Sequence, residues 1–374
     1  MSLIWIVNIL SVFFLCVFFA GIVIPQILLI AFRRRLFDEP DERKIHQCVV
    51  PRLGGMAFKP VVFFSFVLLL AVNVSTGHDE LLKEIGAEAL PLAYAFCAII
   101  MLYLVGIADD LIGVRYRAKF FIQIVCGIML VAGGVELSDL HGMLFIHSMP
   151  SWISIPLTVF VTVFIINAIN LIDGIDGLAS GLGILYCLFF AIYFGLVGST
   201  SWSILAICMI GSLAVFFIYN VFGHRGKIFM GDSGSLLLGY LLTAFVFRFC
   251  EQNAYHVVPE VYHMSAAPAV AICVMTIPIF DTIRVSLTRI KQHRNPFAPD
   301  KNHIHHLLLR TGLNHLQTTG VLLSVSLLFI GLAILGRNWN IWLLLFADFA
   351  LATILTLILW RVLNKKLYGQ NADN

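Results

Sequence analysis

Eleven long apolar runs dominate this chain and restrict it to a helical fold within a membrane. The runs lie at residues 3–32, 54–75, 89–107, 118–134, 152–170, 180–198, 201–222, 236–250, 265–285, 319–336 and 339–360. About 20 apolar residues suffice for a helix to cross a bilayer. Charged residues make up only 12% of the chain, against about 25% in soluble domains. We therefore predict an all-α, polytopic integral membrane bundle of about eleven transmembrane helices.

The segments between the runs are too short to form a separate soluble domain, so residues 1–374 are predicted to form one domain. The eight cysteines lie mostly within apolar runs and form no CxxC pair. This pattern is typical of small core residues and disfavours disulfides or a zinc site. The first run is too long for the apolar core of a cleaved signal sequence, so we expect it to remain as a helix.

Lysine and arginine predict the orientation of the chain, because cytoplasmic loops retain these residues. With eleven spans and the N-terminus outside, 20 of the 24 lysines and arginines fall on the cytoplasmic side. The sixth and seventh runs are separated only by residues 198–201, and their fusion would reverse every later segment. We predict a multi-pass protein with its N-terminus outside and its C-terminus in the cytoplasm.

Five aspartates gather at the predicted cytoplasmic ends of these runs. They are Asp109 and Asp110 in GIADDLIG, Asp173 and Asp176 in NLIDGIDGLASG, and Asp232 in KIFMGDSGS. Carboxylates beside a bilayer are costly, and carboxylate oxygens suit a hard divalent cation. Because the lysines and arginines alone place all five on one side, the aspartates predict an active site at the cytoplasmic face that binds a cation and an anionic substrate.

The adjacent acids Asp109 and Asp110 have a simpler interpretation as a polar turn between two helices. Adjacent carboxylates repel each other unless a cation holds both, however. This favours a role as a general base or as cation-site acids.

Asp232 lies in a glycine-rich loop before a helix, where backbone N–H groups can bind phosphate and the carboxylate can bind magnesium. Ordinary turns also use Asp beside Gly.

A polar stripe emerges from the fifth apolar run. Its members Asn167, Asn170, Asp173 and Asp176 are spaced three residues apart and would share one face of a helix. A plain helix terminus would explain the glycines that follow the aspartates. It would not explain two asparagines deeper in the membrane, so the stripe favours a functional site.

Three histidines, His303, His305 and His306, follow a turn-rich segment and are surrounded by basic residues. An interfacial amphipathic stretch would explain them. A zinc site is disfavoured, because no cysteine lies nearby and the acids suit a harder cation. We predict that the histidines bind a diphosphate or a sugar phosphate. The first cytoplasmic loop, DEPDERKIHQCVVPRLGG, is predicted to be a solvated loop, with a role near the substrate as the alternative.

Six segments together resemble the polyprenyl-phosphate N-acetylhexosamine-1-phosphate transferase family, of the glycosyltransferase family 4 type, and most of all its bacterial undecaprenyl-phosphate N-acetylglucosaminyl-1-phosphate transferases. The segments are RKIHQCVVPRLGG, GIADD, NAINLIDGIDGL, KIFMGDSGS, PIFDTIR and NPFAPDKNHIHHLLLRTG, in the family's order. The resemblance implies an enzyme that transfers N-acetylhexosamine 1-phosphate, GlcNAc 1-phosphate first of all, from a UDP-sugar to undecaprenyl phosphate and releases UMP. It implies magnesium, or manganese, as the cofactor. It also implies a bacterial inner membrane and the start of O-antigen or related cell-envelope polysaccharide synthesis.

The resemblance also implies roles for single residues. Asp232 and Asp173 would bind the metal, and the catalytic acids would be Asp109, Asp110, Asp173 and Asp176. Lys119, in RAKFFIQ, would bind phosphate, and Asn170 would help to position the nucleotide. The histidines His303, His305 and His306 would bind the substrate. Gly113 stands where many relatives carry a third acid, so the division of labour between Asp109 and Asp110 stays open.

Other functions compete with this interpretation. A phospho-N-acetylmuramoyl-pentapeptide transferase would use the same chemistry in peptidoglycan synthesis. A secondary transporter would place its ionisable residues near mid-membrane on broken helices, whereas these acids lie at helix ends. The DG-x-x-AR run of CDP-alcohol phosphatidyltransferases and the DDxxD motifs of prenyl diphosphate synthases are absent. The expected partners are the two substrates and membrane lipid, with a homodimer as an open option and no nucleic acid.

Overall fold

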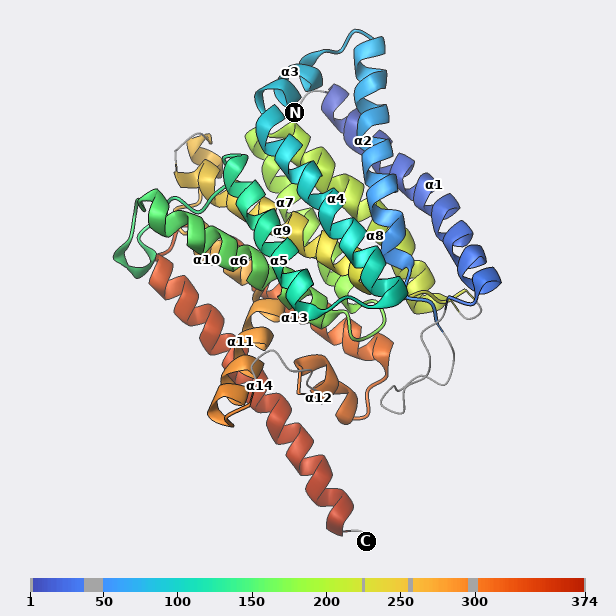
Figure 1. Ribbon diagram of the computed structural model, residues 1–374. Helices are drawn as coiled ribbons and strands as arrows, with labels where there is room; N and C mark the ends of the chain where they lie inside the picture. The colour runs from blue at the N-terminus through green and yellow to red at the C-terminus, as the bar shows by residue number, and fades with distance from the viewer. Residues whose placement is uncertain (1–2, 37–49, 224–225, 255–257, 295–301, 373–374) are drawn as a thin grey trace.

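The computed structural model describes residues 3–36, 50–223, 226–254, 258–294 and 302–372, with side chains placed up to residue 366. Within these residues the chain is helical and contains no strand, which confirms the predicted all-α class (Figure 1). The elements are α1 (Leu3–Arg34), η1 (Gly54–Ala57), α2 (Phe58–Ser75), α3 (Glu80–Ala87), α4 (Ala89–Ile112), α5 (Tyr116–Ala132), η2 (Met143–Phe145), α6 (Ser151–Ile172), α7 (Leu178–Val197), α8 (Thr200–Phe222), α9 (Gly231–Ala254), η3 (Glu260–Tyr262), α10 (Ala267–Val274), α11 (Thr276–Lys291), α12 (Ile304–Arg310), α13 (His315–Leu335) and α14 (Ile341–Ala372).

Each of the eleven apolar runs forms helix. Within the described part of the chain, nine single helices are long and apolar enough to cross a membrane, and the bent pair α10 and α11 would add a tenth. Helix α5, with 17 residues, is shorter than a usual span, so the count of eleven stays a prediction. The sixth and seventh runs form separate helices, because Gly198 ends α7 with φ 85°, a left-handed conformation that favours glycine.

The ninth run does not form the one continuous helix that we predicted for it. It bends by 81° between α10 and α11. Pro278 lies at the start of α11 and carries no backbone N–H, so it cannot donate to the carbonyl of Val274 one turn earlier. Its ring also clashes with that carbonyl in a continuous helix. The proline therefore explains why the run breaks at Met275.

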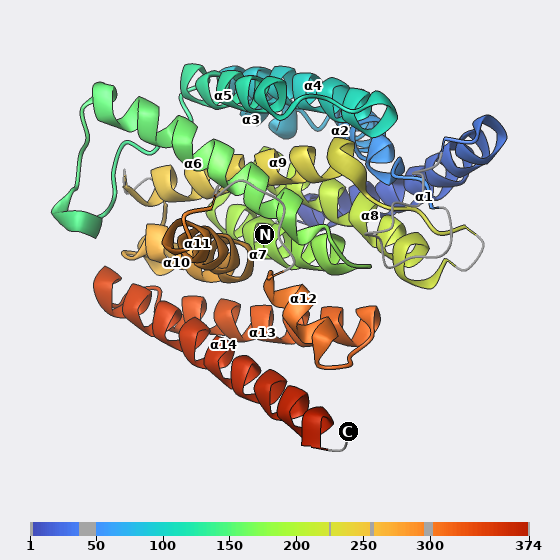
Figure 2. The same cartoon turned by 60° about the horizontal axis from the view of Figure 1, so that its bottom comes forward.

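Helix α9 is the centre of the bundle. It contacts α4, α6, α7 and α10, and its side chains are buried along almost the whole helix. Figure 2 shows α4 and α5 on one side of α9, and α13 and α14 in a layer on the opposite side. A helix that is apolar on every face belongs in such a buried position. The start of α9 carries Asp232, so the central helix delivers that acid to one end of the bundle.

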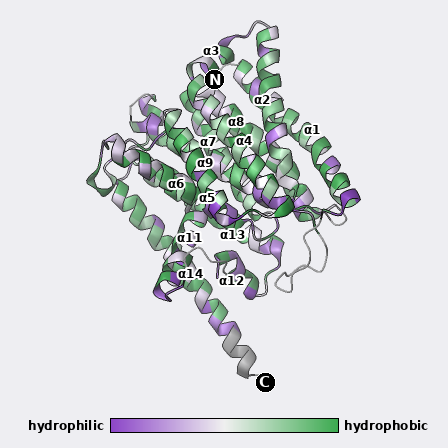
Figure 3. Cartoon of the chain, viewed as in Figure 1, coloured by the Kyte–Doolittle hydropathy of each residue, from purple (hydrophilic) through white to green (hydrophobic). Residues whose placement is uncertain are grey.

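The outer helices expose apolar side chains, as helices that face lipid do. In the most apolar windows of α1 and α14 only 22% of the residues are buried inside the protein, and exposed apolar side chains such as Phe14 and Phe346 line both helices. Figure 3 shows hydrophobic residues over the bundle, and hydrophilic residues around α12 and the lower end of α11. This division matches a bilayer around the bundle and water at its ends.

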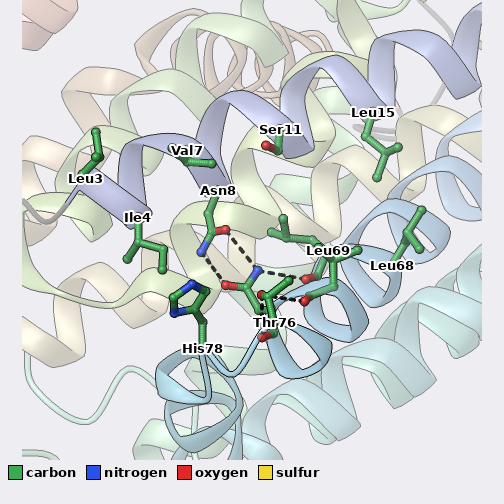
Figure 4. A pocket seen from close by; sticks show the side chains of 12 residues that line it. Leu3, Ile4, Val7, Asn8, Ser11, Leu15, Leu68, Leu69, Thr76 and His78 are labelled. Carbon is green, nitrogen blue, oxygen red and sulfur yellow. Dashed lines mark hydrogen bonds between the residues drawn. The ribbon is translucent and has the colours of Figure 1, made fainter.

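A cavity of about 640 Å³ lies between the first turns of α1 and the last turns of α2 (Figure 4). Its walls are mostly apolar, and the side chains of Asn8 and Asn73 form two reciprocal hydrogen bonds of 3.1 and 3.0 Å there. The other end of α2 is the one that adjoins the start of α9. The cavity is therefore remote from the aspartate clusters.

Candidate active site

The start of α9 is held by a carboxylate from α4. Asp110 accepts hydrogen bonds from the backbone N–H groups of Asp232, at 2.7 Å to Oδ1, and Ser233, at 3.0 Å to Oδ2. The first N–H groups of a helix have no partner within the helix, and a carboxylate there also interacts favourably with the helix dipole. Asp110 thus caps α9 and fixes the position of Asp232.

Glycines allow this close approach of α4 to α9. A Cβ atom added to Gly106 would lie 2.4 Å from Cα of Ser233, so only glycine fits one turn before Asp110. Gly231 has φ +71°, and a Cβ atom there would lie 2.2 Å from the carbonyl oxygen of Arg52 and 2.6 Å from Oδ1 of Asp110. The glycines of GIADD and KIFMGDSGS therefore serve the packing that joins the two motifs.

The described end of the RKIHQCVVPRLGG motif joins the same cluster. The N–H of Phe229 donates to the carbonyl of Pro51 at 2.9 Å, and the N–H groups of Gly54 and Gly55 donate to Phe229 and Met230 at 2.9 and 2.8 Å. Three bonds between backbones thus pin the loop before α2 to the loop before α9. Residues 38–49 of the predicted first cytoplasmic loop lie outside the described residues.

Lys119 links the two acidic motifs. Its Nζ atom lies 3.1 Å from Oδ2 of Asp109 and 2.7 Å from Oδ2 of Asp232. Oδ1 of Asp109 accepts from the N–H of Val114 at 2.7 Å, which fixes the turn between α4 and α5. All three charged side chains remain about one fifth exposed. The predicted phosphate-binding lysine and two predicted site acids therefore form one accessible cluster.

The polar stripe on α6 divides between two neighbours. Asn170 donates to Oδ1 of Asp232 at 3.1 Å and to Oγ of Ser235 at 2.7 Å, so it belongs to the acidic cluster. Asn167 instead donates to Oε1 of Gln123 on α5 at 2.6 Å. Asn167 therefore does not belong to the site as the predicted stripe implied, because its side chain joins α6 to α5.

Asp173 follows the last residue of α6 and faces the same cluster. Burial raises its pKa well above the usual range, and the negative charges of Asp232 and Asp110 add to this rise, while Arg52 opposes it. The residue keeps only partial exposure, so its carboxyl lies among other negative charges with little water around it. A cation or a protonated partner would relieve the repulsion.

Asp176 has a different environment from Asp173. Burial opposes its ionisation, but hydrogen bonds from His315 and Lys227 outweigh this effect and hold its pKa below the usual value. Nδ1 of His315 lies 2.9 Å and Nζ of Lys227 2.7 Å from Oδ2. Oδ1 is buried, and no described residue forms a hydrogen bond with it. Thr319 also donates to the carbonyl of Asp176 at 2.7 Å. Asp176 therefore fastens α13 and the loop before α9 to the turn that carries Asp173.

The histidine motif reaches the same turn. A Cβ atom added to Gly174 would lie 2.6 Å from Nε2 of His305, so this ring lies directly against the residue after Asp173. The ring centroids of His305 and His303 are 5.8 Å apart with nearly parallel planes, and those of His305 and His306 are 4.2 Å apart. The structure thus brings HIHH to NLIDGIDGL, as the prediction of a single site requires.

The three histidines are not equivalent. Burial and the neighbouring His306 lower the pKa of His305 to about 3, so this imidazole is neutral near pH 7 and can offer an N–H group but no charge. His303 is buried and its Nδ1 atom lies 2.8 Å from Oδ2 of Asp281 on α11. His305 therefore contributes no positive charge to the predicted anion site. Residues 295–301, which include Lys301, lie outside the described residues.

Sequence reasoning missed Asp281 as a site residue, although it lies in the quoted motif PIFDTIR. Its Oδ1 atom accepts from the N–H of Ile304 at 3.1 Å and from Nη2 of Arg284 at 2.7 Å. A carboxylate can only accept, so Nδ1 of His303 carries the proton in this pair. Nε2 of His303 is buried and has no hydrogen-bond partner among the residues that the structure describes. Asp281 therefore orients His303 and anchors the start of α12.

The acids fit a divalent cation in part. Asp232 and Asp173 offer carboxylate oxygens, which magnesium prefers. Nowhere in the described ranges do three acidic, histidine or cysteine side chains converge closely enough to enclose an ion. Magnesium usually keeps several waters and takes few protein ligands together with substrate phosphates. The donor set is compatible with such an ion, with manganese as the alternative.

A stability prediction follows from the cap on α9. Asp110→Asn should lower the unfolding midpoint of the detergent-solubilised protein, because the amide offers one acceptor and leaves one N–H of α9 without a partner. Loss of such a cap lowers the free energy of unfolding by about 1 kcal/mol. This corresponds to a decrease of a few degrees in the unfolding midpoint. Asp139→Asn is the matched control, since Oδ1 of Asp139 accepts a single bond from the N–H of His141. Equal midpoints for the two variants would contradict the cap.

Comparison with known proteins extends what the site indicates. The profile described as glycosyl transferase family 4 matches residues 92–249. A probable undecaprenyl-phosphate N-acetylglucosaminyl 1-phosphate transferase of Bacillus subtilis (strain 168) is 33% identical over 341 residues, which cover 90% of this chain and 87% of that protein. The undecaprenyl-phosphate alpha-N-acetylglucosaminyl 1-phosphate transferase of Escherichia coli (strain K12) is 30% identical over 315 residues. These cover 81% of this chain and 77% of that protein. The decaprenyl-phosphate N-acetylglucosaminephosphotransferase of Mycolicibacterium smegmatis is 32% identical over 293 residues. These cover 74% of this chain and 69% of that protein.

Fold, site and comparisons agree on the class of protein. The helices form a polytopic membrane bundle, and the acids of three motifs meet at one of its ends. The chain belongs to glycosyl transferase family 4, and the relatives named above are polyprenyl-phosphate sugar-phosphate transferases. The resemblance predicted from the six sequence segments is therefore confirmed.

Proposed function

We propose that this protein transfers N-acetylhexosamine 1-phosphate, in the first place GlcNAc 1-phosphate, from a UDP-sugar to undecaprenyl phosphate. The products are the undecaprenyl diphosphate sugar and UMP. The names of the Bacillus subtilis and Escherichia coli relatives support the undecaprenyl phosphate acceptor, and the names of all three relatives support a polyprenyl phosphate acceptor and the transferred group. The product would start the synthesis of O-antigen or a related cell-envelope polysaccharide.

The observation that carries the proposal is the cluster of carboxylates around one lysine at the start of α9. Lys119 is in direct contact with Asp109 and Asp232. Asp110 binds the N–H of Asp232, and the charge of Asp232 acts on Asp173. A reaction between two phosphates accumulates negative charge, so an enzyme for it must mainly position and neutralise. Acids that can bind a cation, together with a lysine, supply these functions.

In the proposed step, an oxygen of the lipid phosphate attacks the phosphorus that carries the sugar. A new P–O bond forms, the bond from this phosphorus to the bridging oxygen breaks, and UMP leaves with the electron pair. The lipid phosphate is largely ionised near neutral pH, since the second pKa of a phosphate monoester is about 6. Asp109 and Asp110 are therefore proposed to position the reactants rather than to act as a strong base.

Magnesium would bind to Asp232 and Asp173 and would stabilise charge on the phosphates. Lys119 would contact a phosphate oxygen in place of one of its carboxylate partners. Asn170 would keep Asp232 in position through its 3.1 Å bond. Asp176, held by Lys227 and His315, would support the nucleotide-binding turn, and the histidines would contact the diphosphate or the sugar.

The proposed location is the inner membrane of a bacterium, with the active site at the cytoplasmic face. Twenty lysines and arginines lie on the predicted cytoplasmic side, with the N-terminus outside and the C-terminus inside. A site at this surface would receive a soluble nucleotide sugar from the cytoplasm and a prenyl carrier from the bilayer. A homodimer stays an open proposal.

The test is product analysis with purified protein. Undecaprenyl phosphate, magnesium and a panel of UDP-sugars would be incubated with the protein, and the lipid product identified by mass spectrometry. The panel would include UDP-GlcNAc, UDP-GalNAc and UDP-MurNAc-pentapeptide. We expect a lipid diphosphate sugar and UMP from UDP-GlcNAc. A lipid monophosphate sugar with release of UDP would contradict the proposal, as would turnover of the pentapeptide substrate alone.

The contact between Gly174 and His305 makes a second prediction. Gly174→Ala should raise KM for the UDP-sugar about 10-fold, because the added methyl group would lie 2.6 Å from Nε2 of the buried His305 ring and displace it. Gly86→Ala is the control, since a Cβ atom at Gly86 has open space around it. Steady-state kinetics of UMP release measure both. Wild-type KM for Gly174→Ala would remove His305 from the substrate site.

A further inference from the structure

One carboxyl group lies inside the membrane layer, away from the acidic cluster. Asp348 is on α14, seven residues after its start, which places it roughly 10 Å along the helix. The residue is 1% exposed. Within the described ranges no basic side chain forms an ion pair with it, and its polar neighbours include the hydroxyl of Thr276 and the thiol of Cys273. Such a residue is rare within a membrane and needs a physical reason.

The partner of Asp348 lies at the bend between α10 and α11. Oδ1 of Asp348 lies 2.7 Å from Oγ1 of Thr276, the first residue of α11. The same hydroxyl oxygen lies 2.8 Å from the carbonyl oxygen of Cys273, near the end of α10. The rings of Phe280 and Phe349 pack at 6.1 Å beside this contact. Asp348 thus joins α14 to the break itself.

The geometry favours the neutral form of this carboxyl group. Thr276 has one hydroxyl hydrogen, and the carbonyl oxygens of Cys273, at 2.8 Å, and Ile272, at 3.3 Å, can accept it. It can therefore donate to a carbonyl and accept from a protonated Asp348. Burial of a carboxylate without a cation costs far more than burial of a neutral, hydrogen-bonded acid. The acid then completes a short chain of hydrogen bonds that satisfies a carbonyl near the bend, where the regular helix pattern is interrupted.

The direction of α11 matters for the active site, because α11 carries Asp281 five residues after Thr276. At 1.5 Å per residue, a change of 10° in the direction of α11 would displace Asp281 by roughly 1.3 Å. Asp281 holds His303 and the start of α12. A displacement of about 1 Å at a catalytic group can lower a rate roughly 100-fold.

We propose that Asp348 is a positioning residue that, through Thr276, fixes the bend between α10 and α11 and so aims Asp281 and His303 at the substrate. The residue acts from within the membrane and does not touch the substrate. Its effect on catalysis rests on the proposed function, whereas its effect on the direction of α11 does not. The two can therefore be tested separately.

The experiment measures the direction of α11 in the full-length protein by pulsed EPR. Spin labels would be attached to Leu287→Cys on α11 and Phe160→Cys on α6, two exposed positions, after Cys48 and Cys97 are replaced by serine. The distance distribution would be compared for the parent, Asp348→Leu and Asp348→Asn. Thr276→Val and Thr276→Ser form a second pair on the other side of the contact. Thr356→Val, which removes a hydroxyl elsewhere on α14, is the control.

We expect Asp348→Leu and Thr276→Val to broaden or shift the distribution and to lower kcat/KM for the UDP-sugar about 10- to 100-fold. Asp348→Asn and Thr276→Ser should keep the parent distribution and lie within about 3-fold of its kcat/KM, because they retain a neutral hydrogen-bonding group. If Asp348→Leu does not fold, the threonine pair decides. An unchanged distance distribution in Thr276→Val or Asp348→Leu would overturn the proposal. A loss of kcat/KM in Asp348→Asn equal to the loss in Asp348→Leu would also overturn it.

Discussion

Asp232→Asn is expected to lower kcat for UMP release at least about 1000-fold, which corresponds to about 4 kcal/mol of transition-state stabilisation. Asp232 accepts from Lys119 at 2.7 Å and from Asn170 at 3.1 Å. The amide would keep the size of the side chain but remove the charge that binds Lys119 and would bind the cation. Loss of a metal ligand and of a charge partner together explains the large effect.

The control for Asp232→Asn is Asp79→Asn. Asp79 is exposed before α3, and its side chain makes no cap hydrogen bond, so this change removes one negative charge away from the cluster. Both variants should keep the unfolding midpoint of the parent within a few degrees. A folded Asp232→Asn protein with kcat within 10-fold of the parent would remove Asp232 from the site.

Asp281→Asn is expected to lower kcat/KM about 100-fold without loss of the fold. Asparagine can still accept from Ile304 and Arg284, but its NH₂ group would face Nδ1 of His303. That nitrogen would then have to accept, and the proton would move to Nε2. The variant therefore switches the tautomer of a buried histidine, which changes what His303 can offer to a substrate.

A double-mutant cycle tests whether Asp281 acts through His303. If it does, Asp281→Asn combined with His303→Gln should be no worse than the more damaging single variant. Glu260→Gln, an exposed acid in η3, is the control for charge loss. Strictly additive losses in the cycle would show that Asp281 acts independently of His303.

The helices could be predicted from the sequence because apolar runs report membrane insertion directly. The bend at Met275 could not, since hydropathy averaged over residues 265–285 hides it. Pro278 carried the signal, because a proline removes one hydrogen bond of a helix. The number of spans also depends on α5, whose 17 residues end just before Gly133. Run length alone does not decide whether so short a helix crosses the bilayer.

The acids of the site could be predicted because each lies at a helix end in a recognisable motif. Their partners could not, since a pattern shows which face a residue shares but not what lies opposite. Asp176 pairs with His315, 139 residues later, and with Lys227. The site assignments themselves stay predictions until the variants are measured. The structure adds that Asp110 binds backbone N–H groups, which no spacing indicated.

The most direct test of the account asks whether the acidic cluster and the histidine motif lie at the same face of the membrane. Single cysteines would replace Ile112 at the end of α4, Arg310 at the end of α12, and Val261 in η3, all exposed positions. A membrane-impermeant maleimide would be applied to right-side-out and inside-out vesicles, with Cys48 and Cys97 replaced by serine. We predict that positions 112 and 310 react only in inside-out vesicles and position 261 only in right-side-out vesicles. Reaction of 112 and 310 from opposite faces would contradict a single shared site.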